Sequence, residues 1–238
     1  MKTKPVNYLK IFLFLIVIFS FSNCQPHKYI FPDQNFTNAL YEENVDINRD
    51  GFFDEKEYLT IEKLRLTRKS ITDITGIEKF KNLKELSINE NYITDFSPLQ
   101  KLSKLQTLAI TLNPKISEID LSENKNLEVL YAAKLGLKNI LLNNKIRLLY
   151  LGDNEFTSFD ASKYPNLESL NLDGCKNLQT VDISKNSKIF QLYFNGTSLK
   201  ELDVSNNKKI KTIYVESNVK LIKDSTQKNV KSSLIIQN

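Results

Sequence analysis

The sequence is poor in the residues on which most enzyme sites and metal centres depend. It has one histidine, two cysteines, one methionine and six glycines in 238 residues. The single histidine, His27, lies near the amino terminus, so a nucleophile elsewhere in the chain has no histidine base near it in sequence. No glycine-rich phosphate loop, Gly-x-Ser-x-Gly elbow or zinc-ligand spacing occurs. We therefore expect a protein that is not an enzyme.

The chain also lacks a large excess of basic over acidic residues. The formal net charge is +5, but Lys2, Lys4 and Lys10 belong to an amino-terminal segment without acidic residues, and without that segment +2 remains. A charge this small does not favour nucleic acid as a partner.

What the chain has in abundance is a repeated pattern. A frame of the form apolar-x-x-apolar-x-apolar-x-x-Asn returns about every 22 residues, and Leu83, Leu86, Ile88 and Asn91 show it clearly. Eight copies start at Ile61, Leu83, Leu105, Leu127, Ile146, Leu167, Ile189 and Ile210. Internal repeats of this length indicate a solenoid in which each turn buries its apolar residues against its neighbours. The fourth copy is three residues short, so we expect an irregular ladder near Asn143.

These residues resemble the leucine-rich repeat family, whose consensus is L-x-x-L-x-L-x-x-N/C-x-L. The early copies are similar to bacterial internalin-type repeats, and later ones carry tails such as Leu202-Asp203-Val204-Ser205. The resemblance covers residues 61–218. It implies an α/β solenoid, a horseshoe with short parallel strands on its concave face, that serves as a binding scaffold and acts as a monomer. The segment 219–238 is expected to close the last repeat.

The amino terminus predicts export. A basic flank precedes an apolar run, Ile11 to Phe21, which is too short to span a membrane. The run ends at Phe21-Ser22-Asn23-Cys24, which resembles a lipobox and implies a signal peptide over 1–23 and a lipid on Cys24. The protein would then be anchored to a bacterial outer membrane or cell surface through a tether, 24–33. The alternative is ordinary cleavage nearby, which leaves Cys24 a free thiol.

The second cysteine, Cys175, falls in the Asn/Cys position of the repeat frame. We expect it to be a small buried side chain. A disulfide with Cys24 is the alternative in an exported protein.

A candidate calcium loop precedes the repeats. The stretch from Asp46 to Glu57 resembles an EF-hand loop, and the helical pattern around it predicts a cap over 34–60. The spacing implies oxygen ligands from Asp46, Asn48, Asp50, Phe52 (through its carbonyl), Asp54 and Glu57. Calcium would fold the segment that covers the open end of the repeats. The alternative is an acidic turn that caps the array without metal.

The repeat frame also predicts which side chains face outward on the concave sheet, because alternate residues of a strand point to opposite faces. The middle column is rich in tyrosine in its later half: Tyr131, Tyr150, Asn171, Tyr193 and Tyr214. Tyrosine offers a large amphipathic contact area, so this column is a candidate site for a protein or glycan ligand. The alternatives are tyrosines that only stack on one another, and an envelope lipoprotein without a specific ligand.

Overall fold

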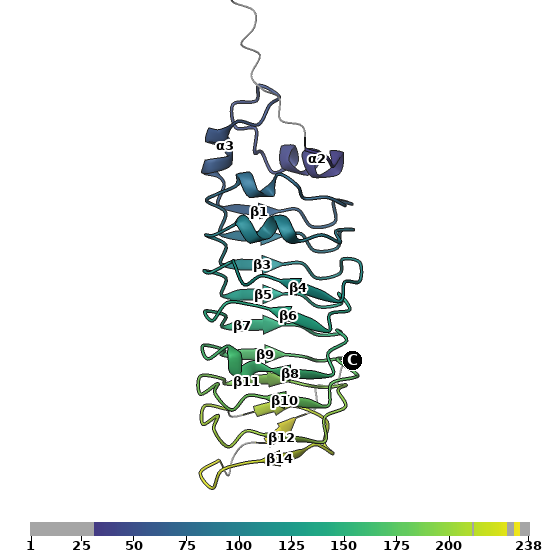
Figure 1. Ribbon diagram of the computed structural model, residues 1–238, viewed down its shortest axis with the longest axis vertical. Helices are drawn as coiled ribbons and strands as arrows, with labels where there is room; N and C mark the ends of the chain where they lie inside the picture. Colours follow the sequence, from purple (N-terminus) through teal and green to yellow (C-terminus); the bar gives the residue numbers. More distant parts are fainter. Residues whose placement is uncertain (1–30, 211, 228–230, 234–238) are drawn as a thin grey trace, which may run out of the picture. The chain divides into compact units, whose positions relative to one another are not determined.

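The computed structural model describes residues 31–210, 212–227 and 231–233, which lie in a single compact unit. Predictions for the signal segment, Cys24 and the first part of the tether lie outside these residues. The described part of the chain winds into a solenoid of short parallel strands, with two helices at its amino-terminal end (Figure 1).

The largest element is a parallel sheet with one strand from each turn of the coil. Its strands, in spatial order, are β1 (Lys63–Arg65), β2 (Glu85–Ser87), β3 (Thr107–Ala109), β5 (Val129–Tyr131), β7 (Leu148–Tyr150), β9 (Ser169–Asn171), β11 (Gln191–Tyr193), β13 (Thr212–Tyr214) and β15 (Lys231–Ser233). All of its pairs are parallel and in register, from Leu64 opposite Leu86 to Leu192 opposite Ile213.

The central residue of each strand forms the core, as the repeat frame predicts. Eight such residues are no more than 2% exposed: Leu64, Leu86, Leu108, Leu130, Leu149, Leu170, Leu192 and Ile213. Burying a leucine side chain contributes about 1.5–3 kcal/mol. One shared interior therefore runs through the stack.

The sheet has one strand more than the eight repeat copies, since β15, in the segment expected to close the last repeat, continues it. One expectation differs from the structure. The short fourth copy does not disturb the ladder: Leu130 pairs with Leu149 in the same register as its neighbours. The missing residues are absorbed away from the sheet, because backbone hydrogen bonds fix the strand positions and the connecting segments are free to shorten.

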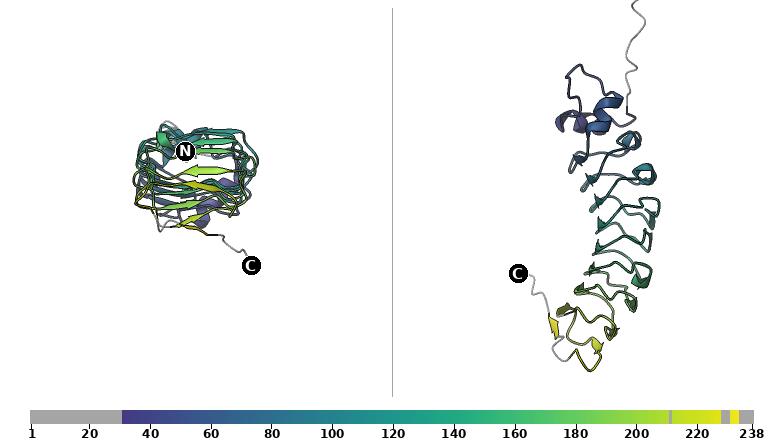
Figure 2. Two further views of the ribbon diagram at one scale, coloured as in Figure 1. Left: turned by 90° about the horizontal axis from the view of Figure 1, so that it is seen from below. Right: turned by 90° about the vertical axis from the view of Figure 1, so that its left-hand side faces the viewer.

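The side opposite the sheet changes character along the chain (Figure 1). The early turns carry the 3-10 helices η1 (Ile77–Lys79) and η2 (Ser97–Lys101) there. The later turns carry short strands and one further 3-10 helix: β4 (Glu118–Asp120), β6 (Asn139–Leu141), β8 (Ser158–Asp160), η3 (Ala161–Lys163), β10 (Thr180–Asp182), β12 (Glu201–Asp203) and β14 (Lys220–Ile222). The change follows the appearance of the Leu-Asp-Val-Ser-like tails. Within this unit the nine-stranded sheet lies on the inner side of the bend (Figure 2).

Buried asparagines hold the turns that follow the main strands. The Asn91 side chain accepts from the N–H groups of Lys69 (3.0 Å) and Ile71 (3.1 Å) and donates to the carbonyls of Leu66 (2.8 Å) and Ile88 (3.0 Å). Asn113 and Asn154 make equivalent contacts. Each side chain thus satisfies buried backbone groups of its own turn and of the preceding one. These asparagines therefore have a structural role.

A second row of buried amides, which the sequence analysis missed, holds the opposite corner. The Asn124 amide donates to the carbonyls of Leu99 (2.7 Å) and Leu102 (3.1 Å). The same kind of contact recurs at Asn143, Asn186, Asn207 and Gln227. The signal was available in the sequence, because Asn124, Asn186 and Asn207 each follow the serine of a Leu-Asp-Val-Ser-like tail by two positions.

The amino-terminal end is covered by helices α2 (Gln34–Glu42) and α3 (Glu55–Thr60). Phe36, Ala39 and Leu40 of α2 are buried. Among the contacts that join the cap to the repeats, the Tyr58 ring packs edge-on against Phe80 with centroids 5.1 Å apart, and the Asp33 carboxylate accepts from the N–H of Thr72 (2.6 Å) and Asp73 (3.1 Å). An apolar open end is therefore sealed, as a solenoid requires.

No helix among the described residues has the length and apolarity needed to cross a membrane.

We expect Asn154→Ala to lower the free energy of unfolding by about 3 kcal/mol, because it leaves three backbone groups, Leu135 N–H, Leu137 N–H and Ala132 C=O, without a partner, at a cost of about 1 kcal/mol or more each. Urea denaturation would measure the change. The matched control is Asn144→Ala, since Asn144 is exposed and should change stability by about 0.5 kcal/mol at most. Equal effects of the two substitutions would contradict the structural role of the buried amide.

Candidate functional site

The register brings the predicted concave-face residues into one row. Tyr131 pairs with Tyr150, Tyr150 with Asn171, Asn171 with Tyr193, and Tyr193 with Tyr214. They alternate with the buried central leucines, so they stand on the solvent side of the sheet. Tyr131 is 39% exposed, and the other four are half-buried. The five residues, here called the tyrosine row, therefore form one continuous strip across β5, β7, β9, β11 and β13.

Within the row, the tyrosines form two stacked pairs. The ring centroids of Tyr131 and Tyr150 are 4.6 Å apart with planes 7° from parallel, and those of Tyr193 and Tyr214 are 4.7 Å apart at 5°. Burial raises the pKa of the Tyr193 phenol, and Tyr214, Tyr150 and Asp173 raise it further. The stacking predicted as an alternative to binding is therefore present, and it holds the rings upright on an accessible face.

Asn171 interrupts the row between the two pairs. Its side-chain oxygen accepts a hydrogen bond from the N–H of Asp173 (3.0 Å), so the amide leans along its own strand. Gly152 makes room for this, because a Cβ there would lie 3.4 Å from the Asn171 oxygen and 3.0 Å from the carbonyl oxygen of Asp173. The row thus has a short polar residue where its neighbours carry rings.

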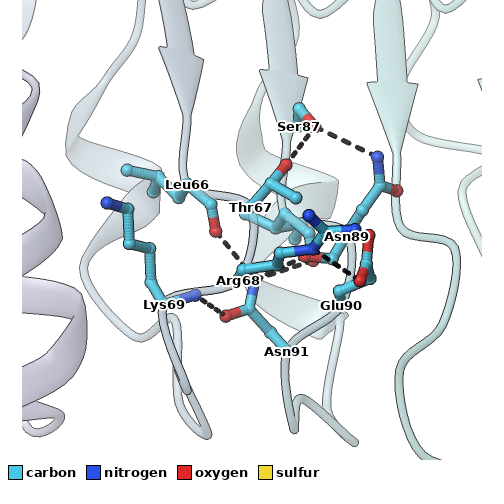
Figure 3. Close-up of polar contacts among 9 residues, drawn as sticks. Leu66, Thr67, Arg68, Lys69, Ser87, Asn89, Glu90 and Asn91 are labelled. Atoms are coloured by element: carbon cyan, nitrogen blue, oxygen red, sulfur yellow. Dashed lines mark hydrogen bonds and ion pairs between the residues drawn. The ribbon is translucent and has the colours of Figure 1, made fainter.

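The amino-terminal part of the same face is polar and satisfied internally. Ser87 bonds to Thr67 (2.9 Å) and accepts from Asn89 (3.2 Å), and an ion pair joins Arg68 to Glu90 at 2.7 Å (Figure 3). These side chains lie beside the Asn91 turn, which Figure 3 also shows. Their hydrogen-bonding capacity is largely used within the face, which favours the tyrosine row as the contact surface.

The edge of the face before the strands carries a charge cluster. Arg147 lies between Glu128 (3.1 Å) and Glu168 (3.0 Å). The hydrogen bonds that the Arg147 guanidinium donates to Glu168 and Glu128 raise its pKa above the ordinary value. Arg147, which directly precedes β7, thus links its own turn to the two neighbouring turns, those of β5 and β9. Since all three side chains are at least partly exposed, this cluster stabilises the stack only modestly.

The candidate calcium loop has the expected turn but a different arrangement of its carboxylates. Gly51 has a φ of +84°, which suits a sharp turn at that position. The Asp46 carboxylate accepts from the N–H of Asp50 (3.2 Å) and Gly51 (3.0 Å), and Glu57 accepts from Ile47 (2.8 Å) and Asn48 (3.3 Å). Asp46 and Glu57, the first and last predicted ligands, thus both accept hydrogen bonds from the backbone of the same short segment, residues 47–51.

The remaining predicted ligands are used locally. Asp54 caps α3 by accepting from the N–H of Glu57 (2.9 Å), and Asp50 accepts from Phe52 (2.9 Å). Across residues 31–210, 212–227 and 231–233, no three carboxylate, histidine or cysteine side chains converge on a point that could hold a metal. The oxygen donors have the chemistry that calcium prefers. The calcium site stays a prediction.

Cys175 is fully buried, and its thiol lies 3.4 Å from the carbonyl oxygen of Leu151. Burial raises the pKa of this thiol to about 11. A buried, protonated thiol is a poor nucleophile, which agrees with the structural role expected for the Asn/Cys position. Cys24 lies outside the described residues, so the alternative disulfide is not tested.

Comparison with known proteins defines the kind of fold. The family described as leucine-rich repeats in two copies matches residues 60–101 and 81–124. InlJ from Listeria monocytogenes, whose functional domain includes a cysteine ladder, is 25% identical with a TM-score of 0.72 over 85% of this chain. The internalin C2 structure from the same organism is 20% identical with a TM-score of 0.72, over 87% of this chain and 95% of that one.

A more distant similarity reaches the LRIM1 leucine-rich repeat domain, which is 18% identical with a TM-score of 0.53 over 82% of this chain and 71% of that one. The comparison with curated protein sequences gave no match. The chain spans 45% of the InlJ chain that it matches.

The chain therefore carries leucine-rich repeats and folds as a leucine-rich repeat solenoid. Its structure is similar to those of the Listeria internalins. Folds of this kind are generally interaction scaffolds without catalytic activity.

Proposed function

We propose that this protein is an exported, lipid-anchored binding protein that recognises a partner protein through its tyrosine row. The observation that carries the proposal is the row of four tyrosines, in two stacked pairs on either side of Asn171, on the open face of the sheet. Rings that are already stacked lose little further conformational freedom when a partner covers them, which favours binding. The paired Arg147 cluster and the polar amino-terminal part of the face would border this contact.

The prediction concerns Tyr150 and Tyr193, which flank Asn171. Replacing both with serine should reduce capture of the partner protein at least about tenfold, since aromatic anchors at an interface commonly contribute more than 1 kcal/mol each. The measurement compares proteins crosslinked to the wild-type chain and to the Tyr150→Ser/Tyr193→Ser variant on intact cells.

Tyr92→Ser is the matched control, because Tyr92 is 62% exposed and lies outside the tyrosine row. Melting curves of all three proteins show whether the fold is kept. If the double variant is folded and captures the same proteins as the wild type, the row is only a structural stack and the protein is an envelope component that does not use this surface.

The anchor is the second part of the proposal. A lipid on Cys24 is supported by the apolar segment before it and its lipobox-like end. Cells that make the full chain in the presence of labelled palmitate should label the wild type and the Cys175→Ser variant but not Cys24→Ser, which should leave the membrane fraction. Label that depends on neither cysteine, or no label on the wild type, would refute the anchor.

The third part is a structural calcium ion in the cap. Asp46, Asn48, Asp50 and Glu57 would supply side-chain oxygens and Phe52 a carbonyl oxygen, with Asp54 acting beside them. Tyr41 supports a concentration of negative charge at this loop. Burial raises the pKa of its phenol, and Asp46, Asp50 and Glu57 raise it further. A divalent cation would relieve that repulsion.

Calcium at millimolar concentration should therefore raise the melting temperature of the protein by several degrees, because a ligand that binds only the folded state stabilises it. Glu57→Gln should abolish this calcium-dependent shift. Glu55→Gln, an exposed substitution in the same helix, should retain it. A wild-type melting temperature that is indifferent to calcium would leave the loop as an acidic cap without metal.

A further inference from the structure

The break in the tyrosine row is flanked by two aromatic faces. Tyr150 and Tyr193 are the in-register neighbours of Asn171 on either side. Their outer faces are covered by Tyr131 and Tyr214, with centroids 4.6 and 4.7 Å apart. Their inner faces are turned toward the position of Asn171, whose amide leans away along its strand. We call the space above Asn171 the β9 gap.

The spacing of the sheet sets the width of this gap. Parallel strands lie about 4.8 Å apart, so Tyr150 and Tyr193, two strands apart, are separated by about 9.6 Å. A flat group held midway would lie about 4.8 Å from each ring. This matches the separations within the two existing stacks. The gap therefore has the dimensions of one missing ring in an otherwise continuous aromatic stack.

Two buried polar atoms beside the gap have unused capacity to accept hydrogen bonds. Ser169, on the same face of β9 as Asn171, is 1% exposed and its hydroxyl has no hydrogen-bond partner among the described residues. On the other side of the row, the side-chain oxygen of Asn195 is also buried and unpartnered within the described part of the chain. Three further buried side-chain oxygens without a partner among the described residues, those of Asn124, Asn186 and Asn207, belong to the second amide row. Beside the gap, the Ser169 hydroxyl and the Asn195 oxygen can each accept a hydrogen bond from a donor-rich group, and buried polar atoms are nearly always paired in folded proteins.

The charge beside the gap is negative. Asp173 is half-buried, and neither it nor Asp153 takes part in an ion pair within residues 31–210, 212–227 and 231–233. Burial and the neighbouring Asp153 raise the pKa of the Asp173 carboxyl, against hydrogen bonds from Asn195 and Asn171. Two carboxylates in this setting favour a cation.

We infer that the β9 gap is the recognition pocket for an arginine side chain of the partner protein, with the guanidinium stacked between Tyr150 and Tyr193 and paired with Asp173. A guanidinium is planar, carries five N–H donors and stacks on aromatic faces, whereas an ammonium group is a hydrated point charge. This inference rests on the proposed function and deepens it, because it names the group that the tyrosine row recognises.

The test uses the full chain on a sensor surface and four probes: peptides of sequence Gly-Gly-X-Gly-Gly with X as arginine, citrulline or lysine, and cellohexaose. Citrulline keeps the planar shape without the charge, and lysine keeps the charge without the plane. The arginine peptide should bind at least about fivefold more tightly than the other two peptides, the ratio expected for a stacked cation.

Two matched variants locate the binding. Asn171→Tyr fills the gap with a fifth ring and should abolish arginine binding. Ala109→Tyr adds a ring beside Tyr131, at the end of the row next to β3, and should leave arginine binding unchanged. Because both extend an existing column of tyrosines, both should fold, and melting curves verify this. Asp173→Asn should reduce arginine binding to the level of citrulline in the wild type.

Unchanged arginine affinity in Asn171→Tyr, or equal affinities for arginine and citrulline, would overturn the inference. So would cellohexaose binding that depends on Tyr150 and Tyr193 in the absence of arginine binding, which would make the ligand a glycan. The proposed function is judged separately: if Asn171→Tyr still captures the partner protein while Tyr150→Ser/Tyr193→Ser does not, the row is the contact surface and only the arginine pocket is wrong.

Discussion

The in-register pairing of three-residue parallel strands is the constraint on which the rest of this structure depends. Each strand is too short to be stable alone. In the first eight strands the central leucine or isoleucine is buried because neighbouring turns supply the same kind of residue at the same height. Two rows of buried amides complete this arrangement by satisfying backbone groups at the corners, where no strand partner is available. Stability is therefore distributed along the stack as contacts between neighbouring turns.

The same constraint creates the surface that we assign to binding. Because register is fixed by the buried column, any residue type repeated beside it becomes a row on the open face. Four tyrosines in five consecutive turns thus form a strip without any dedicated loop or insertion. Stacking does not prevent recognition here. Each stacked pair leaves the edges of its rings accessible to a partner, and the faces of Tyr150 and Tyr193 that point toward Asn171 are not covered by another ring.

The break at Asn171 matters for the same reason. In an irregular surface a single asparagine among tyrosines would have no defined consequence, but in a periodic one it removes one member of a stack and leaves its neighbours about 9.6 Å apart. The same periodicity places the carboxylates of Asp153 and Asp173 beside this aromatic gap. The chemistry of the gap follows from Asn171 and Asp173 in one turn and from Gly152 and Asp153 in the turn before it.

Much of this architecture could be predicted from the sequence. The repeat frame predicts the buried column and the facing of the tyrosine row, because the side-chain period of a strand is fixed. It did not give the ninth strand, β15, whose central residue is a serine, or the undisturbed ladder at the short fourth copy. The second amide row was also missed, although its spacing was present.

The details of the gap were beyond sequence reasoning. The lean of Asn171 depends on the N–H of Asp173 and on the room above Gly152, and the burial of Ser169 depends on neighbours from other turns. The candidate calcium ligands illustrate the same limit: spacing predicted which residues could contribute oxygen, but the orientation of Asp46 and Glu57 is set by competing backbone N–H groups.

The most direct test is a crystal structure of the protein that resolves the rings of the tyrosine row. We expect Tyr150, Asn171 and Tyr193 on three successive strands of the sheet, with the two rings stacked outward on Tyr131 and Tyr214 and an open gap between them. A structure in which the register is shifted, or in which Tyr150 and Tyr193 close over Asn171 against each other, would contradict it.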